Sequence, residues 1–180
     1  MKYCAHCGNP VELLIPAGDN RLRHVCPACG SIHYQNPRMV VGTLPTWKDQ
    51  VMLCRRAIEP RHGYWTLPEG FMENGESAAE GALRETLEEA CAKVALIAPY
   101  TMVSVPYIDQ IHLLFRAELI EPDFAPGTES LEVRLFAEAD IPWDDLAFRS
   151  VSLTLRTFFD ERRSGRFGVH HFSLDAPSQS

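Results

Sequence analysis

Apolar and polar residues alternate over much of the chain after residue 38, and this pattern predicts a sheet. Breaks that contain proline or glycine separate most of the strand-like runs. Only the polar residues 48–50 lie between the first two runs, which is typical of a hairpin. The runs are, in chain order, Met39–Trp47, Val51–Ala57, Val94–Val105, Ile111–Ile120 and Glu132–Ala137.

Two segments have the spacing of a helix. In Ser77–Ala92 the residues Leu83, Leu87 and Ala90 recur at steps of three and four, which predicts an amphipathic helix. Phe148–Arg163 is predicted to form a second helix. Strands with flanking helices indicate an α+β fold, a mixed sheet sandwiched by helices, and the chain shows no internal repeats.

The first 36 residues differ from the rest of the chain. They are rich in Cys, His, Gly and Pro and have little regular periodicity, so hydrophobic burial cannot hold them together. The 180 residues suffice for one core of ~100–150 residues plus a small module. We therefore expect three parts: a metal-bound module at 1–36, a catalytic domain at 37–165 and a C-terminal tail at 166–180, with a loose polar end over Asp175–Ser180.

Composition narrows the function classes. The net charge of −7 argues against general attraction to nucleic-acid backbones, so a nucleic-acid partner is not expected and a phosphate-bearing substrate needs cations. No apolar run approaches the ~18 residues of a membrane span, and the start of the chain lacks the apolar core of a secretory signal. We expect a cytoplasmic protein, in which cysteines are metal ligands or buried thiols.

Four cysteines form two C-x-x-C pairs in turn-forming contexts. Cys4 and Cys7 precede Cys26 and Cys29 by a spacing typical of a zinc site. Four thiolates leave no open coordination position, so this is a structural zinc site that folds the module.

Two other interpretations of the cysteines stay open. One is a redox dithiol pair. The other is a ribbon that binds nucleic acid, which is favoured by the basic residues Lys2, Arg21, Arg23 and Arg38. We interpret the nearby histidines as solvated loop residues, and Cys54 and Cys91 as small buried hydrophobes. These histidines are His6, His24 and His33.

The first predicted helix carries an acidic cluster. Glu85, Glu88 and Glu89 lie on one helix face and repel each other, and only Arg84 precedes them. Carboxylates are the ligands that Mg²⁺ or Mn²⁺ prefers, so the cluster indicates a divalent-cation site. A merely exposed acidic face is the alternative.

The loop before this helix strengthens the cation interpretation, because its glycines allow main-chain carbonyls to approach a metal. With it, the segment resembles the Nudix hydrolase family, whose signature is G-x5-E-x7-R-E-U-x-E-E-x-G-U with U a bulky aliphatic residue. This chain departs from the signature at three positions: Thr86 and Ala92 stand where it has a bulky aliphatic residue, and Cys91 stands where it has glycine. The matching residues are Gly70, Glu76, Arg84, Glu85, Glu88 and Glu89.

Three further segments, Tyr34–Pro37, Arg55–Pro68 and Ile141–Trp143, resemble the zinc-ribbon subgroup of Nudix proteins. That subgroup includes plant enzymes that hydrolyse FAD and ADP-ribose. The resemblance implies a Nudix-type mixed sheet with a small N-terminal zinc ribbon. The S-Q-P-W-P-F-P-x-S motif of NADH pyrophosphatases is absent, which makes reduced dinucleotides the less favoured substrates.

The resemblance also implies a set of site residues. Glu85, Glu88, Glu89 and the main-chain carbonyl of Glu69 would hold two or more Mg²⁺ or Mn²⁺ ions against a diphosphate. Arg84 would orient these glutamates, with a purely structural salt bridge as the alternative.

The remaining site candidates lie outside the signature segment Gly70–Ala92, which we call the box. Glu129 or Glu132 would supply a general base or an extra ligand, unless both are surface glutamates. Arg55 and Arg56 are candidates to contact phosphate. The candidates to stack on a base or flavin ring are Tyr64 and Trp65, although a core position for these two residues is equally compatible with the sequence. His62 is interpreted as a loop residue.

The expected function is metal-dependent hydrolysis of the diphosphate in FAD or ADP-ribose, releasing AMP. Alternatives are an NADH or capped-RNA pyrophosphatase, or a nucleotide-sensing regulator that binds nucleic acid. The complete set of box glutamates disfavours a pure sensor. Related ADP-ribose pyrophosphatases are commonly dimers, so a homodimer is expected.

Overall fold

The computed structural model describes residues 1–176, and its contacts divide the chain into two compact units, Met1–Asn36 and Pro37–Ser180. The predicted loose end, Asp175–Ser180, falls largely outside the described residues, since 177–180 are not among them. None of the described helices combines the length and the apolar character that crossing a membrane requires.

The first unit is a three-stranded antiparallel sheet. Its strands are β1 (Glu12–Leu14), β2 (Arg23–Val25) and β3 (Ile32–His33), in the order β1-β2-β3. All three residues of β1 are exposed, and the fully buried side chains include the cysteines at 4 and 26. The sheet therefore has no apolar core of its own.

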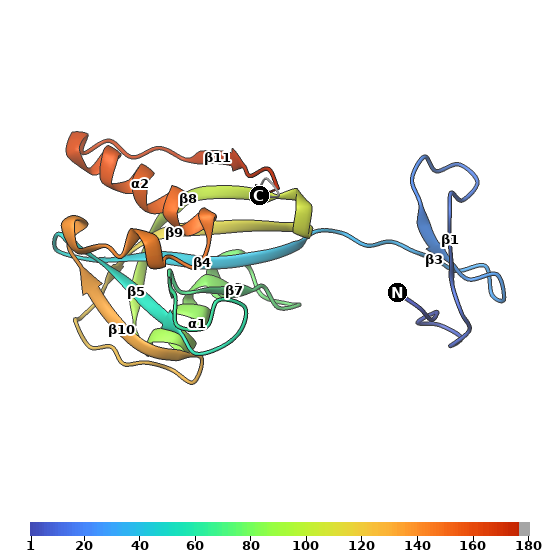
Figure 1. Cartoon of the computed structure of the whole chain (residues 1–180), viewed down its shortest axis with the longest axis horizontal. Coiled ribbons are helices and arrows are strands. Elements are labelled where there is room, and N and C mark those ends of the chain that lie inside the picture. The colour runs from blue at the N-terminus through green and yellow to red at the C-terminus, as the bar shows by residue number, and fades with distance from the viewer. Residues whose placement is uncertain (177–180) are drawn as a thin grey trace. The chain divides into compact units, whose positions relative to one another are not determined.

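The second unit is built on one mixed sheet with the order β10-β5-β4-β9-β8-β11 (Figure 1). β6 pairs with β5, and β7 pairs with β4. The pairs β4–β9 and β8–β11 are parallel, and the other pairs are antiparallel. The strands are β4 (Arg38–Trp47), β5 (Gln50–Arg56), β6 (Trp65–Thr66), β7 (Glu69–Phe71), β8 (Val94–Val105), β9 (Gln110–Leu119), β10 (Ser130–Phe136) and β11 (His170–Ser173).

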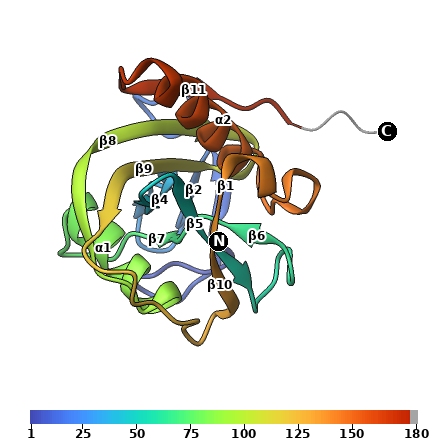
Figure 2. The same ribbon diagram turned by 90° about the vertical axis from the view of Figure 1, so that its left-hand side faces the viewer.

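Two α-helices cover opposite faces of this sheet, as Figures 1 and 2 show. The α-helices are α1 (Ala78–Ala90) and α2 (Arg149–Ser164), and the short 3₁₀ helices are Pro106–Ile108, Glu138–Asp140 and Trp143–Asp145. The alternation of β5 explains the two cores: Val51 and Leu53 pack with α2, whereas Met52 and Cys54 face the core that holds Ala90 of α1. The predicted α+β fold, a mixed sheet between helices, is confirmed.

Helix α1 begins and ends at identifiable signals. Ser77 and Glu80 form a capping box, and the chain leaves the helix at Cys91, whose φ of 49° is left-handed. The helix was predicted correctly, but of its three recurring apolar residues only Ala90 is buried. Leu83 and Leu87 are 38% and 52% exposed, and the buried residues are Gly81, Ala82, Thr86, Glu89 and Ala90.

Three details differ from the sequence prediction. The hairpin turn contains two residues, since Gln50 already pairs with Trp47. Residues 166–180 were expected to be a tail, but they contain β11, whose short run alternates too few apolar positions to reveal a strand. Cys91 is exposed rather than buried, because the helix exit turns it outward; Cys54 is buried as expected.

Candidate functional site

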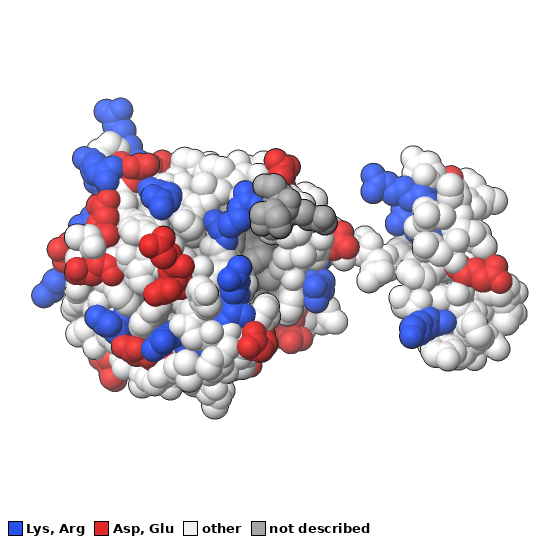
Figure 3. All heavy atoms as spheres, viewed as in Figure 1, with Lys and Arg blue, Asp and Glu red and all other residues white. Residues whose placement is uncertain are grey.

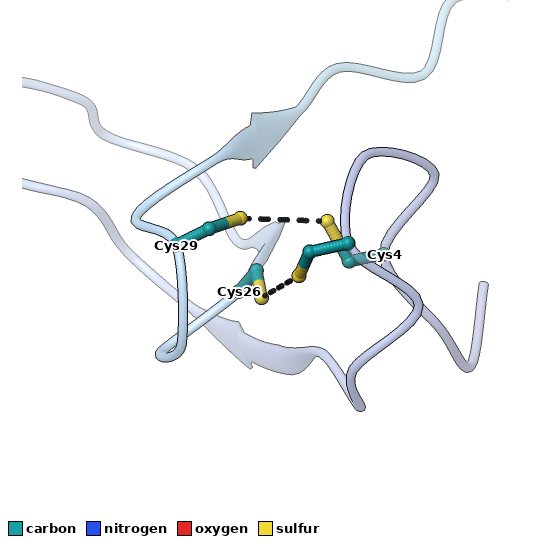
Figure 4. A group of neighbouring side chains, drawn as sticks. Cys4, Cys26 and Cys29 are labelled. Carbon is teal, nitrogen blue, oxygen red and sulfur yellow. Dashed lines mark hydrogen bonds between the residues drawn. The ribbon is translucent and has the colours of Figure 1, made fainter.

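The four cysteine sulfurs of the first unit gather at one point, all within 4.8 Å of one another. The sulfurs of Cys4 and Cys29 are 3.7 Å apart, and those of Cys7 and Cys26 are 3.5 Å apart. A tetrahedral ion with Zn–S bonds of ~2.3 Å requires sulfurs ~3.8 Å apart, so the four residues fit zinc. Figure 4 shows the labelled sulfurs turned toward one another.

Side chains around the sulfurs support this arrangement. The Ser31 hydroxyl lies 3.1 Å from the sulfur of Cys29, and hydrogen bonds from the side chain and main chain of Ser31 lower the pKa of that thiol to about 6. Burial has the opposite effect on Cys26 and raises the pKa of its thiol to about 11. The Nε2 atom of His33 is 3.2 Å from the sulfur of Cys4. The imidazole of His33 therefore contacts a candidate ligand, which the interpretation as a solvated loop histidine missed.

The acidic cluster of the second unit lies where β7 meets α1. Glu89 is 6% exposed, and one of its oxygens accepts a hydrogen bond of 3.2 Å from the main-chain N–H of Glu69. Burial, together with the charges of Glu69 and Glu85, raises the pKa of Glu89 to about 8. Burial also raises the pKa of Glu85. The surroundings of Glu85 and Glu89 thus disfavour the ionised form of both carboxylates unless a cation compensates the charge.

Arg84 ties the box together through its guanidinium. It donates two hydrogen bonds to Glu76, at 3.0 and 2.7 Å, one of 2.7 Å to Glu85 and one of 3.0 Å to Glu88. The hydrogen bonds from Arg84 hold the pKa of Glu76 at about 2. Arg84 thus contacts three box glutamates, an arrangement compatible both with the orienting role and with a purely structural salt bridge.

Two close approaches fix the cluster. A Cβ atom at Gly70 would overlap the Glu85 carboxylate, so a side chain at this position of β7 would displace that carboxylate. Thr86, which departs from the aliphatic signature, is buried, and its hydroxyl lies 2.7 Å from that of Thr43 on β4. The hydroxyl that Thr86 places in the core therefore has a hydrogen-bond partner on β4.

A cavity of about 890 Å³ opens beside these glutamates. Its volume is in the range of small-molecule sites. Glu69, Glu85, Glu88 and Glu89 form one part of the lining. The rest includes four arginines and three aromatic residues, which are Arg56, Arg61, Arg84, Arg149, Phe71, Tyr107 and Phe148.

The structure separates the two candidate bases. Glu129 lines the cavity, and its charge contributes to the raised pKa of Glu85. Glu132 does not line it; its carboxylate lies 4.0 Å from Arg55 and 3.6 Å from Arg134. The role of a base or extra ligand is therefore open only to Glu129 of this pair.

The other candidates divide in the same way. Arg56 lines the cavity, whereas Arg55, its neighbour on β5, points elsewhere and donates to the carbonyl of Gly63. Trp65 is 7% exposed and packs edge to face on Phe136, so the core alternative holds for it. Tyr64 and the exposed His62 do not line the cavity either.

Sequence reasoning missed His112, Arg61 and Arg149, which all line the cavity. His112 lies on β9, and its signal was a lone histidine in an apolar strand. Arg149 begins α2, and Arg61 has a left-handed φ of 67° in the loop after β5. The topology, rather than any local motif, brings these residues together.

Two family models match the chain. The model described as Nudix N-terminal, a zinc ribbon, matches residues 2–35, and the NUDIX domain model matches residues 36–165. The chain belongs to the Nudix hydrolase family. It is thus a hydrolase that combines the Nudix domain with a zinc ribbon.

Its relatives include proteins named NAD-capped RNA hydrolase NudC. The one from Pseudomonas aeruginosa (strain LESB58) is 30% identical over 91% of this chain and 57% of its own length. The one from Chromobacterium violaceum is 29% identical over 81% of this chain and 50% of its own length. This Nudix chain therefore spans about half the length of these relatives.

A solved NUDIX hydrolase from Nitrosomonas europaea is similar throughout. It is 50% identical, with a TM-score of 0.95 over 98% of this chain and 100% of the other. An ADP-ribose pyrophosphatase from Streptococcus suis shares only the fold, at 19% identity and a TM-score of 0.59, over 76% of this chain and 99% of the other.

Proposed function

We propose that this Nudix chain uses a divalent cation to hydrolyse the diphosphate linkage of a nicotinamide–adenine dinucleotide, releasing two phosphate monoesters. The observation that carries the proposal is the placement of the buried Glu89 and the partly buried Glu85 in the wall of an 890 Å³ cavity. The nicotinamide part is supported by relatives named for NAD-capped RNA. These relatives favour the dinucleotide alternative over the FAD or ADP-ribose expected from the sequence.

The donor set fits Mg²⁺ or Mn²⁺, because these glutamates line one cavity and carboxylate oxygens are the ligands that these ions prefer. Glu85, Glu88 and Glu89 would hold the ion. A bound divalent ion polarises a phosphate oxygen and lowers the pKa of a coordinated water. Arg84, which also lines the cavity, would keep the box glutamates in position through its hydrogen bonds to them.

Other side chains of the cavity suit the rest of a dinucleotide. Arg56 is 8% exposed, and its Nε–H donates a hydrogen bond of 2.9 Å to the carbonyl of Pro60. With Arg61 and Arg149 it gives the cavity positive charge that offsets a diphosphate. Glu129, which is exposed and lines the cavity, would accept a proton or serve as an extra ligand.

A substrate panel tests the proposal. Purified protein with Mg²⁺ or Mn²⁺ is incubated with NAD⁺, NADH, FAD, ADP-ribose and NAD-capped RNA, and the products are separated chromatographically. We expect nicotinamide mononucleotide and AMP from the dinucleotides at a higher kcat/KM than AMP from FAD or ADP-ribose. A preference for FAD or ADP-ribose would restore the original expectation, and no cleavage of any compound would overturn the proposal.

Capped RNA is a second candidate substrate, favoured by the names of the relatives. Against it stand the net charge of −7 and the face of the second unit drawn in Figure 3, where acidic and basic side chains are interspersed without a continuous basic stripe. Capped RNA cleaved faster than free NAD⁺ at low salt, with a loss of that advantage at high salt, would favour the RNA substrate.

A further inference from the structure

We propose that the side-chain carboxylate of Glu69, oriented by His112, is itself a ligand of the divalent cation in this cavity. The inference rests on the cation chemistry of the proposed function. It goes beyond the main-chain role expected for residue 69, because a carbonyl ligand tolerates any side chain at this position, whereas a carboxylate ligand does not.

Glu69 has one satisfied and one unsatisfied oxygen. Its side chain is 3% exposed, and Oε2 lies 3.0 Å from Nδ1 of His112. The other oxygen, Oε1, is buried and has no hydrogen-bond partner in the described part of the chain. An oxygen of a carboxylate that is removed from water without a partner is costly, so native proteins usually provide one.

The position of Glu69 points to a cation as that partner. Its main-chain N–H donates to Oε2 of Glu89, so the two residues are in direct contact. The charge of Glu69 also helps to raise the pKa of Glu89. Glu69 and Glu89 are thus adjacent, buried and in the lining of one cavity, and Oε1 of Glu69 has no hydrogen-bond partner among the described residues. Such an oxygen-rich environment is what Mg²⁺ binds.

His112 fixes the orientation of this carboxylate. Its Nδ1 lies 3.0 Å from Oε2 of Glu69 and its Nε2 lies 3.2 Å from Oε1 of Gln110, so contacts at both ring nitrogens restrain the orientation of the ring. The ring is 7% exposed on β9. A histidine that holds a metal-ligating carboxylate in this way is a positioning residue, and loss of such a partner typically weakens metal affinity ~10–100-fold.

A substrate-free Mn²⁺ titration followed by electron paramagnetic resonance tests the ligand role. We expect Glu69→Gln to weaken Mn²⁺ binding by about tenfold or more. The matched control is Glu73→Gln, which removes the same charge from the same cavity at an exposed side chain and should keep the wild-type affinity. Wild-type Mn²⁺ affinity in folded Glu69→Gln would overturn the inference.

Two substitutions at His112 test the positioning role and remain informative if Glu69→Gln does not fold. Asparagine can place an amide N–H where Nδ1 lies, and leucine cannot. We expect His112→Leu to weaken Mn²⁺ binding by about tenfold and His112→Asn to restore most of it. Equal affinities of the two variants would refute the positioning role. Because no nucleotide is present, failure of the proposed substrate class would leave these results unchanged.

Discussion

At the scale of single residues, the same carboxylate takes different roles over a short segment. Glu80 caps α1, Glu76 pairs with Arg84 and has a pKa of about 2, and Glu89 is buried with a pKa of about 8. Glu88 is 58% exposed. The environment of each glutamate, rather than its place in a motif, decides whether it stabilises the helix or prepares a cation site.

Glu89 predicts a pH dependence of stability. A carboxyl whose pKa rises from 4.5 unfolded to about 8 folded stabilises the protein below pH 4.5 and loses this contribution as the pH rises toward 8. In buffer without Mg²⁺ or Mn²⁺, Glu89→Gln should therefore gain stability over wild type between pH 5 and 8. Urea unfolding at several pH values measures the difference between the two proteins; a constant difference would contradict the account.

Cys91 predicts a stabilising substitution. Its φ of 49° is left-handed, which costs a non-glycine residue ~1–2 kcal/mol, and glycine is the residue that the family signature has here. Cys91→Gly should raise the free energy of unfolding by about 0.5–1 kcal/mol. Cys91→Ala removes the thiol but keeps the strain, so it should give no such gain in denaturant unfolding. Equal effects of both variants would assign the change to the thiol.

At the scale of elements, the loop between β9 and β10 completes the end of α1. The N–H groups of Ala125 and Gly127 donate to the carbonyls of Ala90 and Glu89, at 2.9 and 3.0 Å. These carbonyls have no partner within the helix. The same loop then leads to Glu129 at the cavity. The two hydrogen bonds therefore complete the helix end and also hold the loop that carries the candidate base.

Gly127→Ala should disrupt this contact, because a Cβ atom there would overlap the main-chain carbonyl oxygen of Glu88. We expect a loss of about 1–3 kcal/mol in stability and a fall in kcat/KM as Glu129 moves. Gly168→Ala is the control, since its Cβ would have neighbours no nearer than 3.5 Å. Both variants are compared by thermal unfolding and by turnover, and a Gly127→Ala protein equal to its control would contradict this role of the loop.

The comparison of sequence and structure is clearest in α1. The spacing of Leu83, Leu87 and Ala90 predicted the helix, although only Ala90 of the three is buried. A hydrophobic pattern cannot anticipate that a site buries Glu89 instead. The box motif predicted the acidic cluster well because its spacing is local. It could not reveal His112 or Arg149, which β9 and α2 bring to the cavity from distant positions.

At the scale of the whole molecule, the two units depend on different forces. The second unit has extensive buried cores on both faces of its sheet. The first has strands that are exposed or only partly buried, and four sulfurs that gather at one point. Its stability should therefore depend on zinc, and that of the second unit should not.

Removal of zinc should unfold the first unit alone. We expect a strong chelator to release one zinc ion per chain and to collapse the amide NMR signals of residues 1–36 into the unfolded range. Signals from α1 and β4 should keep their positions. Loss of both sets of signals, or retention of both, would contradict a zinc-dependent first unit.

The central claim is that buried box carboxylates and a divalent cation together cleave a dinucleotide. Its most direct test is Mg²⁺-dependent hydrolysis of NADH by wild type, Glu85→Gln and Glu132→Gln, the last a glutamate outside the cavity. We predict Mg²⁺-dependent turnover in wild type, a loss of about 100-fold or more in kcat/KM for Glu85→Gln, and near-wild-type turnover for Glu132→Gln. Full turnover by Glu85→Gln, or turnover by wild type without any divalent cation, would contradict the claim.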